Sequence, residues 1–164
     1  MKTEKLQPEI KLLLHQIDES YEKKAWHGPN LRGSIRGLTV EEAAWRPGRS
    51  RHNIWEIVVH AAYWKYAVRR RLLVEKKGSF PLKGSNWFER PAEASEDAWR
   101  SDVQILESSH RTLREAIEGL SPKDLYFTPP TSKYPNHVMV SGIASHDVYH
   151  AGQIQLIKRL MKRV

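Results

Sequence analysis

Apolar residues recur along the chain at the spacing of one helical face, in four long stretches. The first stripe predicts an amphipathic helix over residues 4–26, and its members are Leu6, Ile10, Leu13, Leu14, Ile17 and Tyr21. Similar stripes predict helices over residues 51–77, from a cap at Ser95 to about residue 120, and over residues 138–161. No convincing strand pattern lies between them. The sequence therefore predicts an all-α four-helix bundle.

Glycine, proline and capping residues divide these helices. Residues 27–37, HGPNLRGSIRG, are expected to form a loop. Thr39 and Glu42 have the spacing of a capping box and predict a short helical turn. Gly78 is expected to end the second long helix, after which residues 78–94 read as a long crossover loop to the third.

The two halves of the chain resemble each other around a histidine. Residues 57–64, IVVHAAYW, align with residues 143–150, IASHDVYH, and this alignment pairs His60 with His146. If a pseudo-twofold relates the halves, we expect the second and fourth long helices to run parallel, with the two histidines at similar depth.

Composition limits the chemistry without changing the fold class. The chain has 164 residues, 40% of them hydrophobic, with a formal net charge of +8, which fits a single domain over residues 1–164. It has no cysteine, so any metal must be held by nitrogen or oxygen ligands. No stretch reaches the roughly 20 apolar residues of a membrane span, and charges occupy the N-terminus where a signal peptide would be apolar. We expect a cytoplasmic protein.

Three histidines are the candidate metal ligands. His146 and His150 are four residues apart, so both imidazoles leave the same face of the last helix and can chelate one ion. His60, on the second long helix, can supply a third nitrogen. Three neutral imidazoles suit Zn²⁺ or Ni²⁺ and leave positions for water or substrate. The alternative is that they are ordinary core residues, as single histidines on apolar faces usually are.

Several other polar residues could belong to such a site. Glu56, one turn before His60, could accept a bond from a ligand, act as a general base or form a salt bridge. Gln153 could hold a ligand water, and His110 could line the pocket or be buried elsewhere. Asp147 follows His146 and so points about 100° away around the helix, which makes it a poor ligand.

Aromatic residues could complete a pocket. Trp87 and Phe88, in the crossover loop, could cover the metal as a lid or simply anchor the loop. Tyr63 and Tyr149 hold equivalent positions in the two halves and could orient a substrate, although such aromatics usually belong to the core.

Two motifs resemble a known family. The string SHDVYHAGQI (145–154), together with WEIVVHAAYW (55–64) after WRP (45–47), resembles the DinB/YfiT-like family, whose members are proposed metalloenzymes. The resemblance implies a four-helix bundle that is a mirror variant of up-and-down topology. It also implies a metal held by His60, His146 and His150. Family members with assigned activities are thiol-dependent transferases and isomerases that use bacillithiol or mycothiol, and some resemble hydrolases.

The expected function is therefore a metal-dependent reaction on a small molecule, of hydrolase or thiol-dependent transferase type, with a low-molecular-weight thiol as a candidate cosubstrate. The alternative is a non-catalytic module that binds metal or a ligand as an oligomer, for which a homodimer is the candidate assembly.

Basic residues cluster near the ends of the second and fourth helices, which parallel helices would bring together: Arg69, Arg70, Arg71, Lys76, Lys77, Lys158, Arg159, Lys162 and Arg163. Such an end could attract nucleic acid or an acidic substrate. Basic residues are favoured at helix C-termini in any case, and no nucleic-acid motif accompanies them. Nucleic-acid binding is the weaker expectation.

Overall fold

The long helices found in the computed structural model match the four hydrophobic stripes. The structure describes residues 6–162 apart from residues 77 and 79. Its long helices are α1 (Pro8–Tyr21), α4 (Ile54–Leu72), α5 (Glu96–Glu118) and α6 (Asn136–Met161). Shorter elements are α2 (Leu31–Ile35), α3 (Val40–Ala44) and the 3₁₀ turn η1 (Asp124–Tyr126). The described residues form no named strand, and the predicted all-α class is confirmed.

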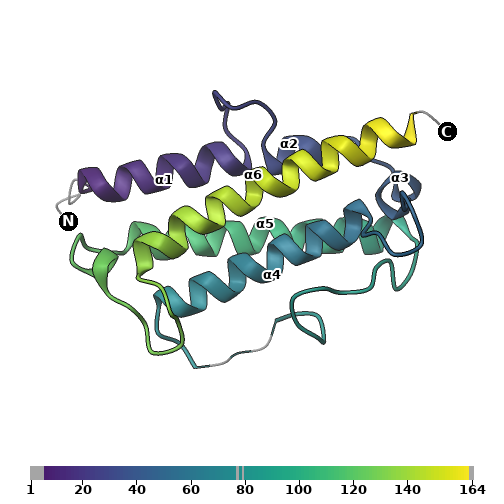
Figure 1. The fold of residues 1–164 in the computed structure, drawn as a ribbon. Coiled ribbons are helices and arrows are strands. Elements are labelled where there is room, and N and C mark those ends of the chain that lie inside the picture. The colour runs from purple at the N-terminus through teal and green to yellow at the C-terminus, as the bar shows by residue number, and fades with distance from the viewer. Residues whose placement is uncertain (1–5, 77, 79, 163–164) are drawn as a thin grey trace.

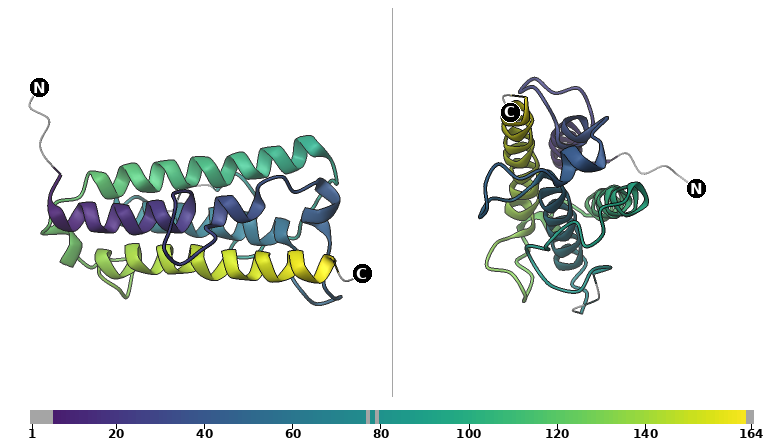
Figure 2. Two further views of the ribbon diagram at one scale, coloured as in Figure 1. Left: turned by 90° about the horizontal axis from the view of Figure 1, so that it is seen from above. Right: turned by 90° about the vertical axis from the view of Figure 1, so that its right-hand side faces the viewer.

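The crossover connection sets the directions of the helices. Residue numbers rise in the same direction along α4 and α5: Trp55 Nε1 donates to Asp102 (2.6 Å), and further along both helices Lys65 Nζ lies 3.5 Å from His110 Nδ1. The two helices are therefore parallel, while α1 and α6 run the opposite way (Figure 1). The end view in Figure 2 shows the four long helices around one shared interior. The crossover loop lies where it was predicted, between α4 and α5, and the mirror-variant handedness stays a prediction.

The expected parallel arrangement of α4 and α6 is wrong. His60 faces His150 with ring centroids 4.9 Å apart, whereas Trp64, one turn later, faces His146 at 6.5 Å. Contacts thus ascend along α4 while they descend along α6, and the helices are antiparallel (Figure 1). A pseudo-twofold axis perpendicular to the helices, rather than parallel to them, makes the two related helices antiparallel. His60 and His146 can still lie at the same level along the bundle.

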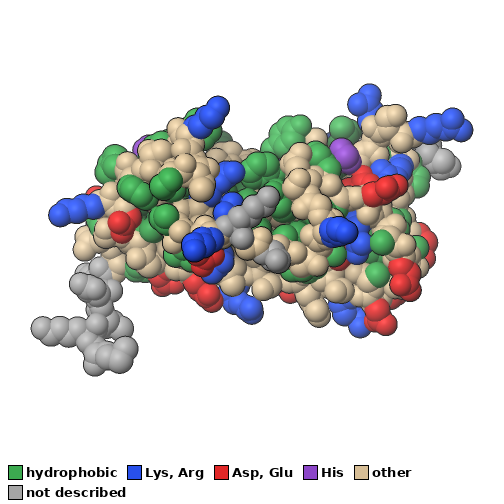
Figure 3. All heavy atoms as spheres, turned by 90° about the horizontal axis from the view of Figure 1, so that it is seen from below, with side chains coloured by type: hydrophobic (Ala, Val, Ile, Leu, Met, Phe, Trp, Pro, Cys, Tyr) green, Lys and Arg blue, Asp and Glu red, His purple; other side chains and the backbone are tan. Residues whose placement is uncertain are grey.

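Antiparallel packing also separates the basic clusters. Residues 69–71 end α4 at one end of the bundle, and Lys158 and Arg159 lie near the end of α6 at the other. Lys77 and Arg163 lie outside the described residues. On the face shown in Figure 3, acidic and basic side chains are interspersed. The common basic end considered as a nucleic-acid surface therefore does not form from the described residues.

Buried apolar residues from all four long helices fill the interior. One cluster surrounds Trp55, Leu106 and Ile154, each with no exposed surface. The other is built on Ile17 and Leu113. None of the described helices combines the length and hydrophobicity needed to cross a membrane.

Several predicted boundaries differ from the structure. The first helix begins at Pro8, because proline fits the first turn of a helix, and it ends at Tyr21. It is therefore shorter than the predicted 4–26, of which residues 4 and 5 lie outside the described part. The predicted loop 27–37 contains α2, whose first turn is capped by the Asn30 side chain accepting from Gly33 N (2.7 Å). The capping box of Thr39 and Glu42 is confirmed.

The second long helix is shorter at both ends than predicted. Asn53, rather than Ser50, caps α4. The helix ends at Leu72 because Val74 adopts a left-handed conformation (φ 52°) and Glu75 N bonds back to Arg70 O, in the pattern of a Schellman motif. A β-branched residue is an uncommon choice at that position, so the sequence pointed instead to Gly78.

Candidate metal centre

The three predicted histidines converge between α4 and α6. His146 Nε2 lies 3.1 Å from His60 Nε2 and 3.0 Å from His150 Nε2. One ligand atom from each of the three residues lies within 4.8 Å of the other two. Among the described residues, these histidines form the group that could hold a metal ion. Nitrogens on one tetrahedral Zn²⁺, each at about 2.0–2.1 Å from the ion, lie roughly 3.3 Å apart. The spacing therefore suits a single ion.

Hydrogen bonds on the far side of two rings set their tautomers. His60 Nδ1 bonds to the carbonyl oxygen of Asn86 (2.7 Å), and His150 Nδ1 bonds to Gln153 Oε1 (2.7 Å). Since each acceptor requires a proton on Nδ1, the Nε2 atoms of both rings carry lone pairs. Gln153 Nε2 in turn donates to Tyr149 Oη (3.0 Å), which keeps Oε1 directed at His150.

The third ring leaves a polarity conflict that a cation would remove. His146 Nε2 faces two lone pairs but can hold at most one proton, and its Nδ1 is buried without a partner among the described residues. At least one close contact is therefore between two acceptors if no ion is present. A metal between the Nε2 atoms accepts all of these lone pairs, so the donor set fits a bound divalent cation.

Burial keeps the imidazoles in the form that binds metal. It lowers the pKa of His60 to about 4 and that of His146 to about 3. It also lowers the pKa of His150. Neutral imidazole is the ligand form, so few protons compete with a metal at neutral pH.

The crossover loop covers one side of the cluster. Trp87 stacks between His60 (centroids 3.8 Å apart) and His52 (3.6 Å). Asn86, which supplies the carbonyl oxygen to His60, also accepts from Trp64 Nε1 (2.9 Å). Of the two loop aromatics predicted as a lid, Trp87 contacts the cluster, whereas Phe88 is buried against Tyr63 and serves as an anchor.

Glu56 bonds to His52, the residue on which Trp87 stacks, and not to the three clustered histidines. Its carboxylate accepts from Arg46 and from His52 Nδ1 (2.9 Å), and its oxygens also close the cap of α4 at Asn53. Burial alone would raise the pKa of Glu56, but the bonds from Arg46 and His52 lower it. A carboxylate held in this way is ionised and occupied, so the salt-bridging alternative describes Glu56 better than a general base does.

Comparison with known proteins assigns the family. A model of the DinB superfamily matches residues 25–154. The chain belongs to the DinB superfamily. Searches of curated proteins and of solved structures found no significant match.

Two hollows flank the histidine cluster of this DinB protein. The Trp87 hollow, of about 650 Å³, is lined by residues that include Trp87, Tyr149, His150 and Gln153. The Arg71 hollow, of about 280 Å³, lies on the His146 side between α4 and α6; its lining includes Trp64, Val68, Arg71, Met139, Gly142 and His146. His146 is the half-buried member of the cluster, while His60 and His150 are buried.

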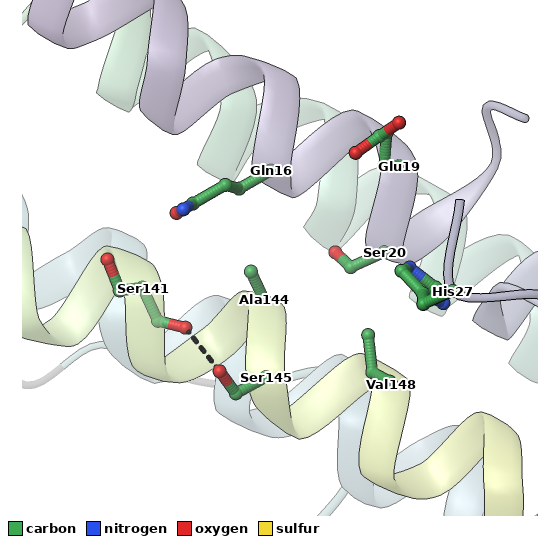
Figure 4. A pocket seen from close by; sticks show the side chains of 8 residues that line it. All are labelled: Gln16, Glu19, Ser20, His27, Ser141, Ala144, Ser145 and Val148. Carbon is green, nitrogen blue, oxygen red and sulfur yellow. Dashed lines mark hydrogen bonds between the residues drawn. The ribbon is translucent and has the colours of Figure 1, made fainter. Parts of the chain in front are cut away.

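A third hollow lies on another face of α6. It occupies about 330 Å³ between α1 and α6 and is lined by residues that include Gln16, Glu19 and His27 (Figure 4). The bond drawn there, from Ser145 Oγ to Ser141 O (3.0 Å), stays within α6. None of the three clustered histidines lines it, so it is separate from the candidate metal centre.

Two other candidates lie away from the cluster. His110 is buried and stacks on Tyr21 (centroids 3.7 Å apart). Asp147 points away from the histidines, as its helical position predicted, and forms a fully buried ion pair with Lys65.

Sequence reasoning about this DinB protein missed His52, Asn86 and Lys65. Asn86 gave a usable signal, since it follows Gly84 and Ser85 and adopts a left-handed conformation (φ 63°) that asparagine tolerates. His52 lies four residues before Glu56, a spacing that indicates a local pair but not the Trp87 ring above it. For Lys65 no local signal marks its burial.

Proposed function

We propose that this DinB protein is a metal-dependent enzyme acting on a small molecule, with Zn²⁺ or Ni²⁺ held by His60, His146 and His150. The observation that carries the proposal is the convergence of three Nε2 atoms, with outward-facing bonds that fix the rings, beside hollows of about 650 and 280 Å³. A closed structural zinc site would instead have four protein ligands.

The reaction expected is hydrolysis or transfer of a thiol. A bound metal supplies Lewis acidity, which lowers the pKa of a coordinated water or thiol. The chain itself has no cysteine, so a thiol nucleophile must arrive as a low-molecular-weight cosubstrate. Asn86 and Gln153 hold the ligand rings in one tautomer, and Trp87 excludes water from one side of them.

Metal content of untagged protein tests the site. We expect about one Zn²⁺ or Ni²⁺ per chain by elemental analysis. We expect loss of the metal, with helical content kept, in His150→Ala. His137→Ala is the matched control, because His137 lies on the same helix against Tyr126 and outside the cluster. Full occupancy in a variant lacking all three ligands would exclude the site.

The alternative is a module that binds metal or a ligand without turnover. Exchangeable water on the bound metal, measured by relaxation of solvent protons after substitution with a paramagnetic ion, favours the enzyme. A screen of thiols with electrophilic acceptors then identifies the reaction class. Turnover that requires metal supports catalysis, and a saturated metal without water supports the module. A homodimer and a cytoplasmic location stay predictions from the sequence, and nucleic-acid binding is not proposed.

A further inference from the structure

The Arg71 hollow contains a guanidinium that lies against the Trp64 ring and takes no part in the proposed metal centre. Among the described residues Arg71 forms no ion pair, and its Nε is shielded from solvent without an acceptor. The neighbouring Arg69, by contrast, is paired with Glu75 (2.8 Å). No acidic side chain lines the Arg71 hollow in the described part of the chain. The guanidinium is therefore available to an anionic ligand.

This hollow runs along the groove between α4 and α6, from His146 to Arg71. Trp64 lies between them, with its ring 6.5 Å from His146 and 5.8 Å from the Arg71 guanidinium carbon. Arg71 is seven residues after Trp64, about 10 Å along the helix axis. Long helical side chains lean toward the N-terminus of their helix, which brings the guanidinium back toward Trp64. A small molecule in this hollow can therefore contact His146 and Arg71 at the same time.

Gly142 keeps the groove accessible next to His146. It lies in the middle of α6, one turn before His146 on the same face, where glycine is less favourable than alanine. A Cβ built on Gly142 would meet no atom within 4 Å. A larger residue at this position would therefore project into the space that leads to His146.

We propose that the Arg71 hollow binds the carboxylate end of the substrate, which is a small organic acid with an apolar body and its reacting end at His146. Arginine pairs with a carboxylate through two parallel hydrogen bonds. Trp64, Val68 and Met139 give an apolar wall for the body of such a ligand. The position of the reacting end rests on the proposed metal-dependent function, whereas carboxylate recognition by Arg71 does not.

Calorimetric titration with 4-phenylbutyrate and with its uncharged analogue 4-phenylbutanol tests the assignment. We expect wild-type protein to bind the acid about ten- to a hundredfold more tightly, the range given by a charged hydrogen-bonded pair. Arg71→Gln should abolish this preference. Arg70→Gln removes the same charge from the adjacent position and should retain it, which controls for the net positive charge of the chain. An acid preference of equal size in Arg71→Gln and wild type would overturn the proposal.

Two further variants separate this inference from its alternatives. Gly142→Leu places a good helix former in the groove, so it should fold with at least wild-type helical content and bind neither compound; unchanged binding would overturn the proposal. The metal-deficient His150→Ala leaves the Arg71 hollow intact and should keep the acid preference, even if the proposed metal-dependent reaction fails. A preference lost in His150→Ala but kept in Arg71→Gln would place the carboxylate on the metal and refute recognition by Arg71.

Discussion

The buried pair of Lys65 and Asp147 gives the sharpest stability prediction. Both side chains have no exposed surface, and the Lys65 ammonium also lies near His110 Nδ1 and 4.9 Å above the Tyr21 ring. Lys65→Met keeps the apolar stem and the volume but leaves the Asp147 carboxylate uncompensated. Breaking one partner of a buried pair costs about 3–5 kcal/mol, a large fraction of the roughly 5–15 kcal/mol by which proteins are stable.

Removing both charges should be far less harmful. In Lys65→Met combined with Asp147→Leu no buried charge is left without a partner, and replacement of whole buried pairs is often neutral or stabilising. We therefore expect the double variant to recover most of the stability that Lys65→Met loses. This non-additivity, rather than the cost of either substitution alone, is the signature of a buried pair.

Urea unfolding followed by circular dichroism at pH 7, with chelator present to remove metal linkage, measures these free energies. The exposed pair of Arg32 and Glu107 is the matched control, since its side chains are 43% and 42% exposed. Arg32→Met should cost less than about 1 kcal/mol. A cost below about 1 kcal/mol for Lys65→Met, or costs that simply add in the double variant, would refute the uncompensated-charge reasoning.

The remaining predictions concern acid, metal removal and the loop. Burial lowers the pKa of His110 to about 3, so the folded state favours neutral imidazole and loses stability as pH falls below the unfolded pKa of about 6.5. Metal-free His110→Phe should lose roughly 2 kcal/mol less than wild type between pH 7.5 and 5.0, measured by urea unfolding. Chelator should lower the Tm of the metal-loaded protein at pH 8 by roughly 10 °C in calorimetry, since ligand at a thousandfold above Kd stabilises by about 4 kcal/mol. Trp87→Phe should keep one metal per chain but weaken the fluorescence response to Ni²⁺, whereas Trp26→Phe, at a 99% exposed position, should not.

Each of these has a result that contradicts it. Parallel acid-stability curves for wild type and His110→Phe would mean that His110 does not remain neutral in the folded state. Equal Tm values with and without chelator would exclude a site of useful affinity. An unchanged Ni²⁺ response in Trp87→Phe would mean that Trp87 does not cover the site in solution.

The candidate site was only partly predictable from sequence. His146 and His150 are neighbours because any helix places residues four apart on one face. His60 joined them through the resemblance between the two halves and the family motif. The bond from His60 to Asn86, the stacking of Trp87 on His52 and the surroundings of Lys65 could not be predicted. Each depends on segments that meet only after the crossover loop has packed against the bundle.

The features of the fold likewise separate into those set by local sequence and those set by tertiary packing. Local sequence determined the helices, the caps at Thr39 and Ser95 and the all-α class, because periodicity and capping act over a few residues. Tertiary structure alone decided that α4 and α6 are antiparallel, that α4 ends before Val74 and that Asp147 pairs with Lys65. These features depend on which faces become buried together, and a repeated helical pattern is compatible with either direction until the whole interior is packed.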